Sequence, residues 1–357
     1  MSGASRADLE YGGVSKNKRL AESRFTHETS PMNDFQTVPL SLIEQIAGII
    51  YDEKKQITNR DLLDLCSAAG VDSFSSDPHL CHEIAETALN FLILQKYGRQ
   101  SLSSDEPSTF CSTILKPLQK RLPTQSWRSD AQITYQQFST PASIAYLAAY
   151  LLNLSDKDTV LEPSCGTGNL AVWALSACAT VISNDIDPRR RELAALVGLS
   201  TTGHDAEFID DLLPEDVIPN VVLANPPFSS SGGRIARNQS KFGFRHVESA
   251  LRRLAPGGRF GVILGDGGSL KSITGKRFWR SLLPNIHLTV AIDLPGREYY
   301  RNGVSVAVSL LIGRKVSNEE RDTVAVVASP ISITASSVED AFDKALASQL
   351  RFDPDPE

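Results

Sequence analysis

The chain has 357 residues, of which 41% are hydrophobic, and a formal net charge of −6. This length allows one large domain plus an appendage with a buried core, while the negative charge gives no whole-chain signal for binding nucleic acid. The N-terminus lacks the apolar core of a signal peptide and no run of about eighteen apolar residues occurs, so we expect a cytoplasmic protein without a membrane segment.

The five cysteines are scattered along the chain, without the CxxC spacing of a zinc site. We therefore expect reduced thiols in a reducing compartment, and no bound metal.

The first 124 residues divide into a polar tail and a helical region. Residues 1–36 are rich in Gly, Ser and mixed charge, and we expect a disordered tail. Residues 37–124 are predicted to form a helical domain, because apolar side chains recur there at helical spacing over residues 41–52, 59–70, 79–97 and 108–122. Such a domain can dock a partner or specificity subunit, clamp nucleic acid or shield a sheet, and the sequence leaves all three open.

A strand, a glycine turn and a helix are predicted in succession after residue 158. Residues 159–161 form an apolar strand, Gly166-Thr167-Gly168 the turn, and residues 169–179 the helix. Glycines let the backbone pass close to a ligand. Glu162 lies between the strand and the turn, where its carboxylate can pair with an ammonium group. The motif GxxxxGK[ST] is absent, which disfavours a phosphate-binding loop.

A second apolar strand, residues 180–184, ends in acidic residues. Asp185, with Ile186 beside it, lies where a carboxylate would hold a ribose diol, and Asp187 is predicted to cap a helix beginning near Pro188. A third strand around residues 200–204 would place Asp205 where the amino group of adenine can donate to it. Glu207 and Asp210 are alternatives for this contact.

The stretch Val221 to Phe228 carries the most specific motif, Asn225-Pro226-Pro227-Phe228. Consecutive prolines end a strand and make the backbone rigid, which fixes the direction of the Asn225 side chain and of the Pro226 carbonyl. Two oxygens aimed at one NH2 group can accept both of its hydrogens and expose the nitrogen lone pair. Phe228 would stack on a base that has left its duplex. Together with the glycine turn, these residues indicate S-adenosylmethionine and an exocyclic amine.

The segment after Phe228 is basic and interleaved with aromatic residues, and the basic character continues to Arg280 against only Glu248 and Asp266. Positive charge gathered beside a site in an acidic protein is typical of a phosphate-binding face. The residues predicted to bind nucleic acid are Arg234, Arg237, Lys241, Arg245, Lys276 and Arg277.

The remaining elements complete an α/β fold, a doubly wound and mostly parallel seven-stranded sheet. Strands are predicted at residues 259–264, 287–294 and 304–312, with an edge strand at 323–328 and a helix over 337–350. Tyr299, Tyr300 and Arg301, in the connection after the second of these strands, either line a base pocket or belong to the core.

These motifs resemble the amino-methylating, S-adenosylmethionine-dependent DNA methyltransferases, in particular N6-adenine enzymes of the Taq type and modification subunits of type I restriction systems. The resemblance covers roughly residues 135–315 and includes Phe138-Ser139-Thr140-Pro141, which in that group covers the methionine end of the cofactor. It implies a methyltransferase domain at 130–330, followed by a C-terminal helix and acidic tail at 331–357. Cys165 varies from the usual pattern of the glycine turn, and it is counted with the cofactor-binding residues.

The function predicted is methylation of adenine N6 in DNA, in a bacterial, phage or plasmid setting associated with the nucleoid. RNA-base and protein-glutamine methyltransferases share the Asn-Pro-Pro motif, so both stay open as substrates. A non-catalytic, cofactor-binding subunit of a larger complex is a second alternative. No large target-recognition domain is expected after the last strand, so specificity would come from loops, the N-terminal helices or a separate subunit. The lack of a Pro-Cys dipeptide disfavours the thiolate attack used by cytosine C5 methyltransferases.

Overall fold

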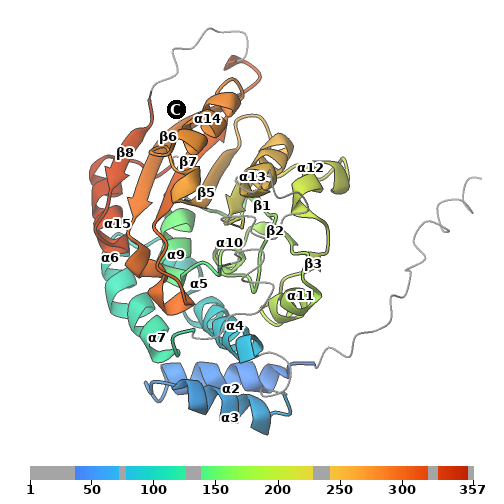
Figure 1. Cartoon of the computed structure of the whole chain (residues 1–357), viewed down its shortest axis with the longest axis vertical. Coiled ribbons are helices and arrows are strands. Elements are labelled where there is room, and N and C mark those ends of the chain that lie inside the picture. The colour runs from blue at the N-terminus through green and yellow to red at the C-terminus, as the bar shows by residue number, and fades with distance from the viewer. Residues whose placement is uncertain (1–36, 72–77, 126–137, 228–241, 321–328, 353–357) are drawn as a thin grey trace, which may run out of the picture. The chain divides into compact units, whose positions relative to one another are not determined.

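The computed structural model describes residues 37–71, 78–125, 138–227, 242–320 and 329–352, and an eight-stranded sheet organises them (Figure 1). The strand order is β3-β2-β1-β4-β5-β7-β6-β8. The strands are β1 (Thr159–Glu162), β2 (Thr180–Asn184), β3 (Thr201–Thr202), β4 (Val221–Ala224), β5 (Arg259–Gly265), β6 (Ile286–Leu294), β7 (Val308–Lys315) and β8 (Ile331–Thr334).

The predicted doubly wound, mostly parallel sheet is confirmed, with one strand more than the seven expected. Neighbouring strands pair in parallel except where β7 pairs antiparallel with β5 and with β6. The additional strand is β8, whose alternating Ile-Ser-Ile-Thr sequence pairs in parallel with β6. The edge strand expected at 323–328 lies outside the described residues.

Helices cover both faces of the sheet because successive strand residues point in opposite directions. Val160, Val221 and Leu223 face one core, which contains α9 (Ala142–Leu151) and α10 (Ala171–Ser176). Leu161 and Val222 face the other core, which contains α13 (Phe242–Arg253) and part of α14 (Ile273–Leu282). Every residue of α9 is buried, so this helix lies within the protein interior.

Among the N-terminal helices, the long helix α4 (Pro78–Lys96) packs directly against the helices of the sheet region. α2 (Leu40–Tyr51) and α3 (Asn59–Ala68) pack on α4, which in turn contacts α10 and α11 (Pro188–Ala195) (Figure 1). Residues Thr37–Glu357 form one compact unit. The predicted boundary near residue 124 stays a prediction, and the tail expected at 1–36 lies outside the described residues.

The remaining helices that have a predicted counterpart agree with it to within a few residues, whereas the helices Gly98–Leu102 and Ile209–Leu212 were not predicted. The helix expected at 108–122 is divided by a π-helical turn, Cys111–Leu115. The other helical elements are α5 (Gly98–Leu102), α6 (Pro107–Phe110), α7 (Lys116–Arg121), α12 (Ile209–Leu212), α15 (Val338–Ala347), and the 3-10 turns Ala206–Phe208, Asp266–Gly268 and Gly296–Asn302. Across the described ranges, none of the helices has the length and apolar character needed to span a bilayer.

Candidate active site

Three predicted site residues lie at the carboxyl ends of neighbouring parallel strands. Glu162 ends β1, Asp185 follows β2 and Asn225 follows β4. Because β1 pairs in parallel with both β2 and β4, the three residues lie along one edge of the sheet. In a doubly wound sheet this edge is where ligands bind.

The glycine turn places backbone without bulky side chains at this edge of the sheet. The N–H of Gly166 donates to Oδ2 of Asp185 at 2.7 Å, which fastens the turn to the end of β2. Gly168 has a φ of +95°, and a Cβ at this position would lie 2.7 Å from Cδ1 of Leu199. A side chain would be strained there, so the second glycine of the motif is required by the backbone and by its neighbour.

Asp185 is held from two directions. Besides the bond from Gly166, its Oδ1 accepts a hydrogen bond from the N–H of Asp187 at 2.9 Å. Burial raises the pKa of Asp185, while its hydrogen bonds act in the opposite direction. The adjacent Ile186 is 55% exposed, so an aliphatic surface lies beside the carboxylate, an arrangement suited to a sugar and a flat ring. The predicted ribose contact of Asp185 stays a prediction.

Asp187 has the capping role that the sequence predicts. Its Oδ1 accepts from the N–H of Arg189 at 2.9 Å, and α11 begins at Pro188. This bond satisfies one of the free donors of the first helical turn.

Glu162 is a buried carboxylate with unused hydrogen-bonding capacity. The backbone N–H of Ala171 lies against the carboxyl group of Glu162. The Oε2 atom of Glu162 is buried without a hydrogen-bond partner among the described residues. Burial raises the pKa of Glu162 well above its usual value, and the nearby Asp185 raises it further. A buried acceptor of this kind is costly unless a ligand supplies a donor, and the ammonium group of a methionine would do so. The chemistry of this residue therefore fits S-adenosylmethionine.

Asn225 is oriented by the Phe-Ser-Thr-Pro segment. Its Nδ2 donates to the carbonyl oxygen of Phe138 at 3.1 Å and to Oγ1 of Thr140 at 2.8 Å. A carbonyl can only accept, so the amide nitrogen faces this segment and Oδ1 faces away. The Oδ1 atom is buried and has no hydrogen-bond partner within the described ranges. The site thus presents an acceptor that is fixed in direction and available to a donor.

The two prolines that follow are buried and closely covered. A Cβ at Gly243 would lie 2.5 Å from the carbonyl oxygen of Pro227, so α13 passes directly over the second proline. Tyr299 is buried beside Asn225; burial raises the pKa of this phenol, and the Asn225 amide acts in the opposite direction. Tyr299 is therefore a core residue next to the site, whereas Tyr300 is 65% exposed. Phe228 lies outside the described residues.

Among the candidate adenine-binding acids, Asp205 is the one whose carboxylate forms no ion pair with any described residue. Glu207 pairs with Arg245, and Asp210 pairs with Arg252. Asp205 is half-buried and caps the turn Ala206–Phe208. These pairs favour Asp205 over the two alternatives, and its contact with adenine stays a prediction.

Cys165 and Pro141 have structural positions next to the site. The Cys165 thiol is buried, and burial raises its pKa well above the usual value, so it remains a neutral packing group. Pro141 is buried at the start of α9, immediately after Thr140.

Two polar residues of the site were missed by the sequence reasoning. His246 is buried on α13, and its Nδ1 lies 3.3 Å from Oγ of Ser164 in the glycine turn; burial lowers the pKa of His246 to about 4. Asn169 donates from Nδ2 to the carbonyl of Thr140 at 2.8 Å. Asn169 directly follows the glycine motif, so its polar type at the start of an apolar helix was a usable signal, whereas His246 gave none.

Much of the predicted basic face is used within the fold. Arg245 pairs with Glu207, and the other basic residues in internal contacts are Arg252 with Glu248 and Asp210, Arg253 with the carbonyls of Val217 and Pro214, Arg259 with Asp158, and Lys271 with Asp293. The expectation that only Glu248 and Asp266 oppose this charge is therefore wrong, because the partners come from distant parts of the chain. Lys276 and Arg277 are exposed on α14. Arg234, Arg237 and Lys241 lie outside the described residues.

A metal centre has no support in the described part of the chain, where no group of three or more His, Cys, Asp and Glu side chains is arranged to hold an ion.

The same fold is found in a solved structure described as a class I S-adenosylmethionine-dependent methyltransferase. This structure, from Listeria monocytogenes, superposes with a TM-score of 0.50 at 16% identity, covering 87% of this chain and 96% of that one. No family model matches the sequence.

Two curated relatives come from restriction-modification systems. The chain is 24% identical over 232 residues to the methylase subunit of the type I restriction enzyme EcoKI of Escherichia coli (strain K12), covering 52% of this chain and 42% of that protein. It is 25% identical over 147 residues to the type II restriction enzyme and methyltransferase RM.BcgI of Heyndrickxia coagulans, covering 35% and 23%. The chain therefore spans less than half the length of these relatives.

Replacing Asp185 with asparagine is expected to weaken S-adenosylmethionine binding by about 1.5–3 kcal/mol, the size of a lost hydrogen bond to a charged group. The backbone N–H groups of Gly166 and Asp187 now donate to the two carboxylate oxygens of Asp185. The asparagine side chain has one oxygen, so its NH2 group would face one of these two donors. Isothermal titration calorimetry measures the affinity. Asp187→Ala is the matched control, because it removes a helix cap and should lower thermal stability with unchanged affinity. Equal affinity for the Asp185 variant and wild type would move the ribose contact elsewhere.

Proposed function

We propose that this protein is an S-adenosylmethionine-dependent methyltransferase that modifies an exocyclic amine, the N6 group of adenine in DNA. The observation that carries the proposal is the orientation of Asn225. Its amide nitrogen is bound by Phe138 and Thr140, so that its buried oxygen is left for a donor at the ligand edge of the sheet.

Two acceptors would hold the target amine. Asn225 Oδ1 accepts one N–H and the carbonyl of Pro226 accepts the other, which draws the nitrogen towards a tetrahedral geometry and exposes its lone pair. Pro226 and Pro227 keep the second acceptor in place because their backbone torsions are restricted. No separate base is needed to start the reaction, since the amine becomes more acidic as it is alkylated. Phe228 would stack on the extruded base.

The cofactor would occupy the edge formed by the glycine turn and the end of β2. When bound, S-adenosylmethionine supplies an electrophilic methyl group on a sulfonium centre. Glu162 would accept from the ammonium group, Asp185 from the ribose and Asp205 from the adenine amine. Ile186 would cover one face of the ring, while Thr140 and Pro141 would close over the methionine end.

The choice of DNA is supported by the curated relatives, which are restriction-modification proteins by name. The EcoKI relative is a methylase subunit, so we propose that this chain also works with a partner subunit that contributes specificity. A DNA substrate would also place the protein at the nucleoid.

Methyl transfer from radiolabelled S-adenosylmethionine tests the proposal, with duplex DNA, single-stranded DNA and total RNA as parallel acceptors and digestion to nucleosides. We expect N6-methyladenine from DNA. Label in RNA would keep the chemistry and change the substrate. Calorimetry that detects cofactor binding, together with no label in any acceptor, would support the non-catalytic alternative for the chain by itself.

Lys276 and Arg277 are predicted to contact DNA phosphates, because both are exposed on α14. Replacing both with alanine should weaken DNA binding and reduce the slope of log K against log salt by about 1.8, since each lost phosphate contact removes about 0.9. Fluorescence anisotropy over a range of salt concentrations measures the slope. Arg99→Ala/Lys157→Ala is the control, because Lys157 lies in the loop before β1 and Arg99 of α5 pairs with Asp156 of the same loop at 3.0 Å, so both exposed residues lie at the opposite ends of the strands. A slope identical to wild type would remove α14 from the DNA-binding surface.

A further inference from the structure

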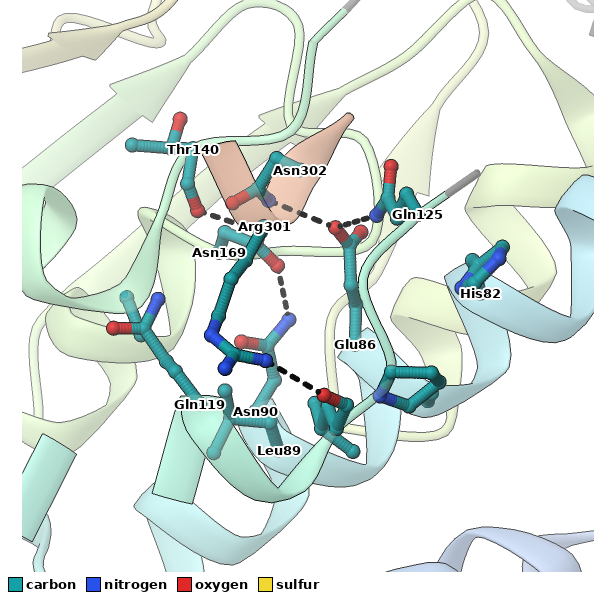
Figure 2. A pocket seen from close by; sticks show the side chains of 14 residues that line it. His82, Glu86, Leu89, Asn90, Gln119, Gln125, Thr140, Asn169, Arg301 and Asn302 are labelled. Carbon is teal, nitrogen blue, oxygen red and sulfur yellow. Dashed lines mark hydrogen bonds between the residues drawn. The ribbon is translucent and has the colours of Figure 1, made fainter. Parts of the chain in front are cut away.

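A buried amide side chain on helix α4, that of Asn90, contacts the glycine turn. Asn90 is 2% exposed, and its Nδ2 donates to Oδ1 of Asn169 at 2.6 Å (Figure 2). The same Nδ2 donates to the carbonyl of Thr167 at 3.2 Å. These partners are 79 and 77 residues away in the sequence. A buried amide that reaches across the chain in this way fixes the relative position of two elements.

The hydrogen bonds continue from Asn90 to the proposed catalytic amide. Asn169 donates from Nδ2 to the carbonyl of Thr140 at 2.8 Å, and Oγ1 of Thr140 accepts from Nδ2 of Asn225, also at 2.8 Å. The direction of each amide is set by a carbonyl that can only accept. Asn90 therefore connects to both parts of the site: to the glycine turn directly, and to Asn225 through Asn169 and Thr140.

Packing does not support this chain of bonds on all sides. Asn90, Asn169 and Thr140 line a polar cavity of about 40 Å³ together with Glu86, Gln125, Arg301 and Asn302 (Figure 2). A polar cavity of this size has room for a few water molecules. The side chains of Asn90, Thr140 and Asn169 are buried, with exposed fractions of 2%, 4% and 9%, and the hydrogen bonds hold them at the border of this cavity.

We propose that Asn90 is a positioning residue for methyl transfer, because it hydrogen-bonds to the glycine turn and is connected to Asn225 through the hydrogen bonds of Asn169 and Thr140. This inference rests on the function proposed above. It makes α4 part of the catalytic unit, although this helix belongs to the N-terminal region whose role the sequence leaves open.

The test compares Asn90→Leu with Thr87→Val in the full chain. Thr87 is also buried on α4, but its hydroxyl donates within the helix, to the carbonyl of Glu83 at 2.8 Å. Both variants lose one buried hydrogen-bonding group, and only Asn90→Leu breaks the link to the site. We expect Asn90→Leu to raise the Kd for S-adenosylmethionine about tenfold and to lower kcat at saturating cofactor about tenfold, because two hydrogen bonds are lost and each is worth about a factor of ten. Thr87→Val should lower only the melting temperature.

The outcomes separate this inference from the proposed function. If wild type is active and Asn90→Leu has the same Kd and kcat as Thr87→Val, the proposed role of Asn90 is overturned. An inactive wild type would overturn the proposed function, and the Kd values of the two variants would then decide whether Asn90 holds the glycine turn. If Asn90→Leu does not fold, Asn90→Ser gives the same comparison, because a small polar residue is tolerated beside an existing polar cavity.

Discussion

Replacing Asn225 with alanine is expected to lower kcat by about 10²- to 10³-fold, the usual loss when a fixed polar group that acts on the reacting atoms is removed. The affinity for S-adenosylmethionine should change little, because the substituted amide acts on the amine and not on the cofactor. The bonds from Nδ2 to Phe138 and Thr140 show why the effect is local: they aim the amide, and they belong to a segment that Asn169 also holds. Single-turnover methyl transfer with calorimetry on the same variant measures both quantities.

Asn220, the residue immediately before β4, provides a matched control. It lies at the opposite end of β4, where its Oδ1 accepts from the N–H of Thr159 at 2.7 Å and its Nδ2 donates to Asp158 at 3.1 Å. Asn220→Ala should reduce the melting temperature and leave turnover unaffected. Wild-type turnover in Asn225→Ala would exclude this amide as the acceptor for the target amine.

The main features of the site could be predicted because they depend on local pattern and on one rule of topology. Glu162, Asp185 and Asn225 each follow a short apolar strand, and the carboxyl ends of parallel strands meet at one edge. The glycine at 168 was also predictable, although its reason, the approach of Leu199, becomes visible only in the fold.

The parts that could not be predicted depend on partners far apart in the sequence. Asn90 looks like any polar residue of an amphipathic helix until Asn169 lies against it. The basic residues after Phe228 looked unopposed because Asp158 and Asp210 precede them by many residues, yet these acids pair with Arg259 and Arg252. Periodicity shows which face of an element is buried, but it does not identify what that face meets.

Replacing Glu162 with glutamine is expected to have opposite effects on stability and on cofactor binding. In the free protein the carboxyl group is buried with one oxygen unpartnered among the described residues, and its pKa is raised by burial. A folded-state pKa above the unfolded value means that stability is fully present below the unfolded pKa, near 4.3, and is lost as the pH rises through the folded pKa, by about 1.4 kcal/mol per pH unit. Glu162→Gln should remove this loss, so the free variant should be more stable than wild type at neutral pH.

Cofactor binding should change in the other direction. The ionised carboxylate pairs with an ammonium group, so the affinity of wild type for S-adenosylmethionine should increase as the pH rises through the raised pKa of Glu162. The variant should lose this pH dependence and bind about 1.5–3 kcal/mol more weakly. Calorimetry and urea unfolding between pH 5 and pH 8 measure both effects.

Glu86→Gln separates the cofactor effect from the general effect of removing a buried acid. Burial also raises the pKa of Glu86, and its Oε1 accepts from Gln125 and Asn302, bonds that a glutamine oxygen can keep. This variant should share the gain in stability with rising pH and bind S-adenosylmethionine like wild type. If Glu162→Gln also bound the cofactor like wild type, the unpartnered oxygen of Glu162 would have no role in holding the methionine ammonium. A destabilised Glu162→Gln would instead show that the carboxylate serves the packing of the free protein. A more stable protein with a weaker cofactor site is the result that only a ligand-binding carboxylate gives.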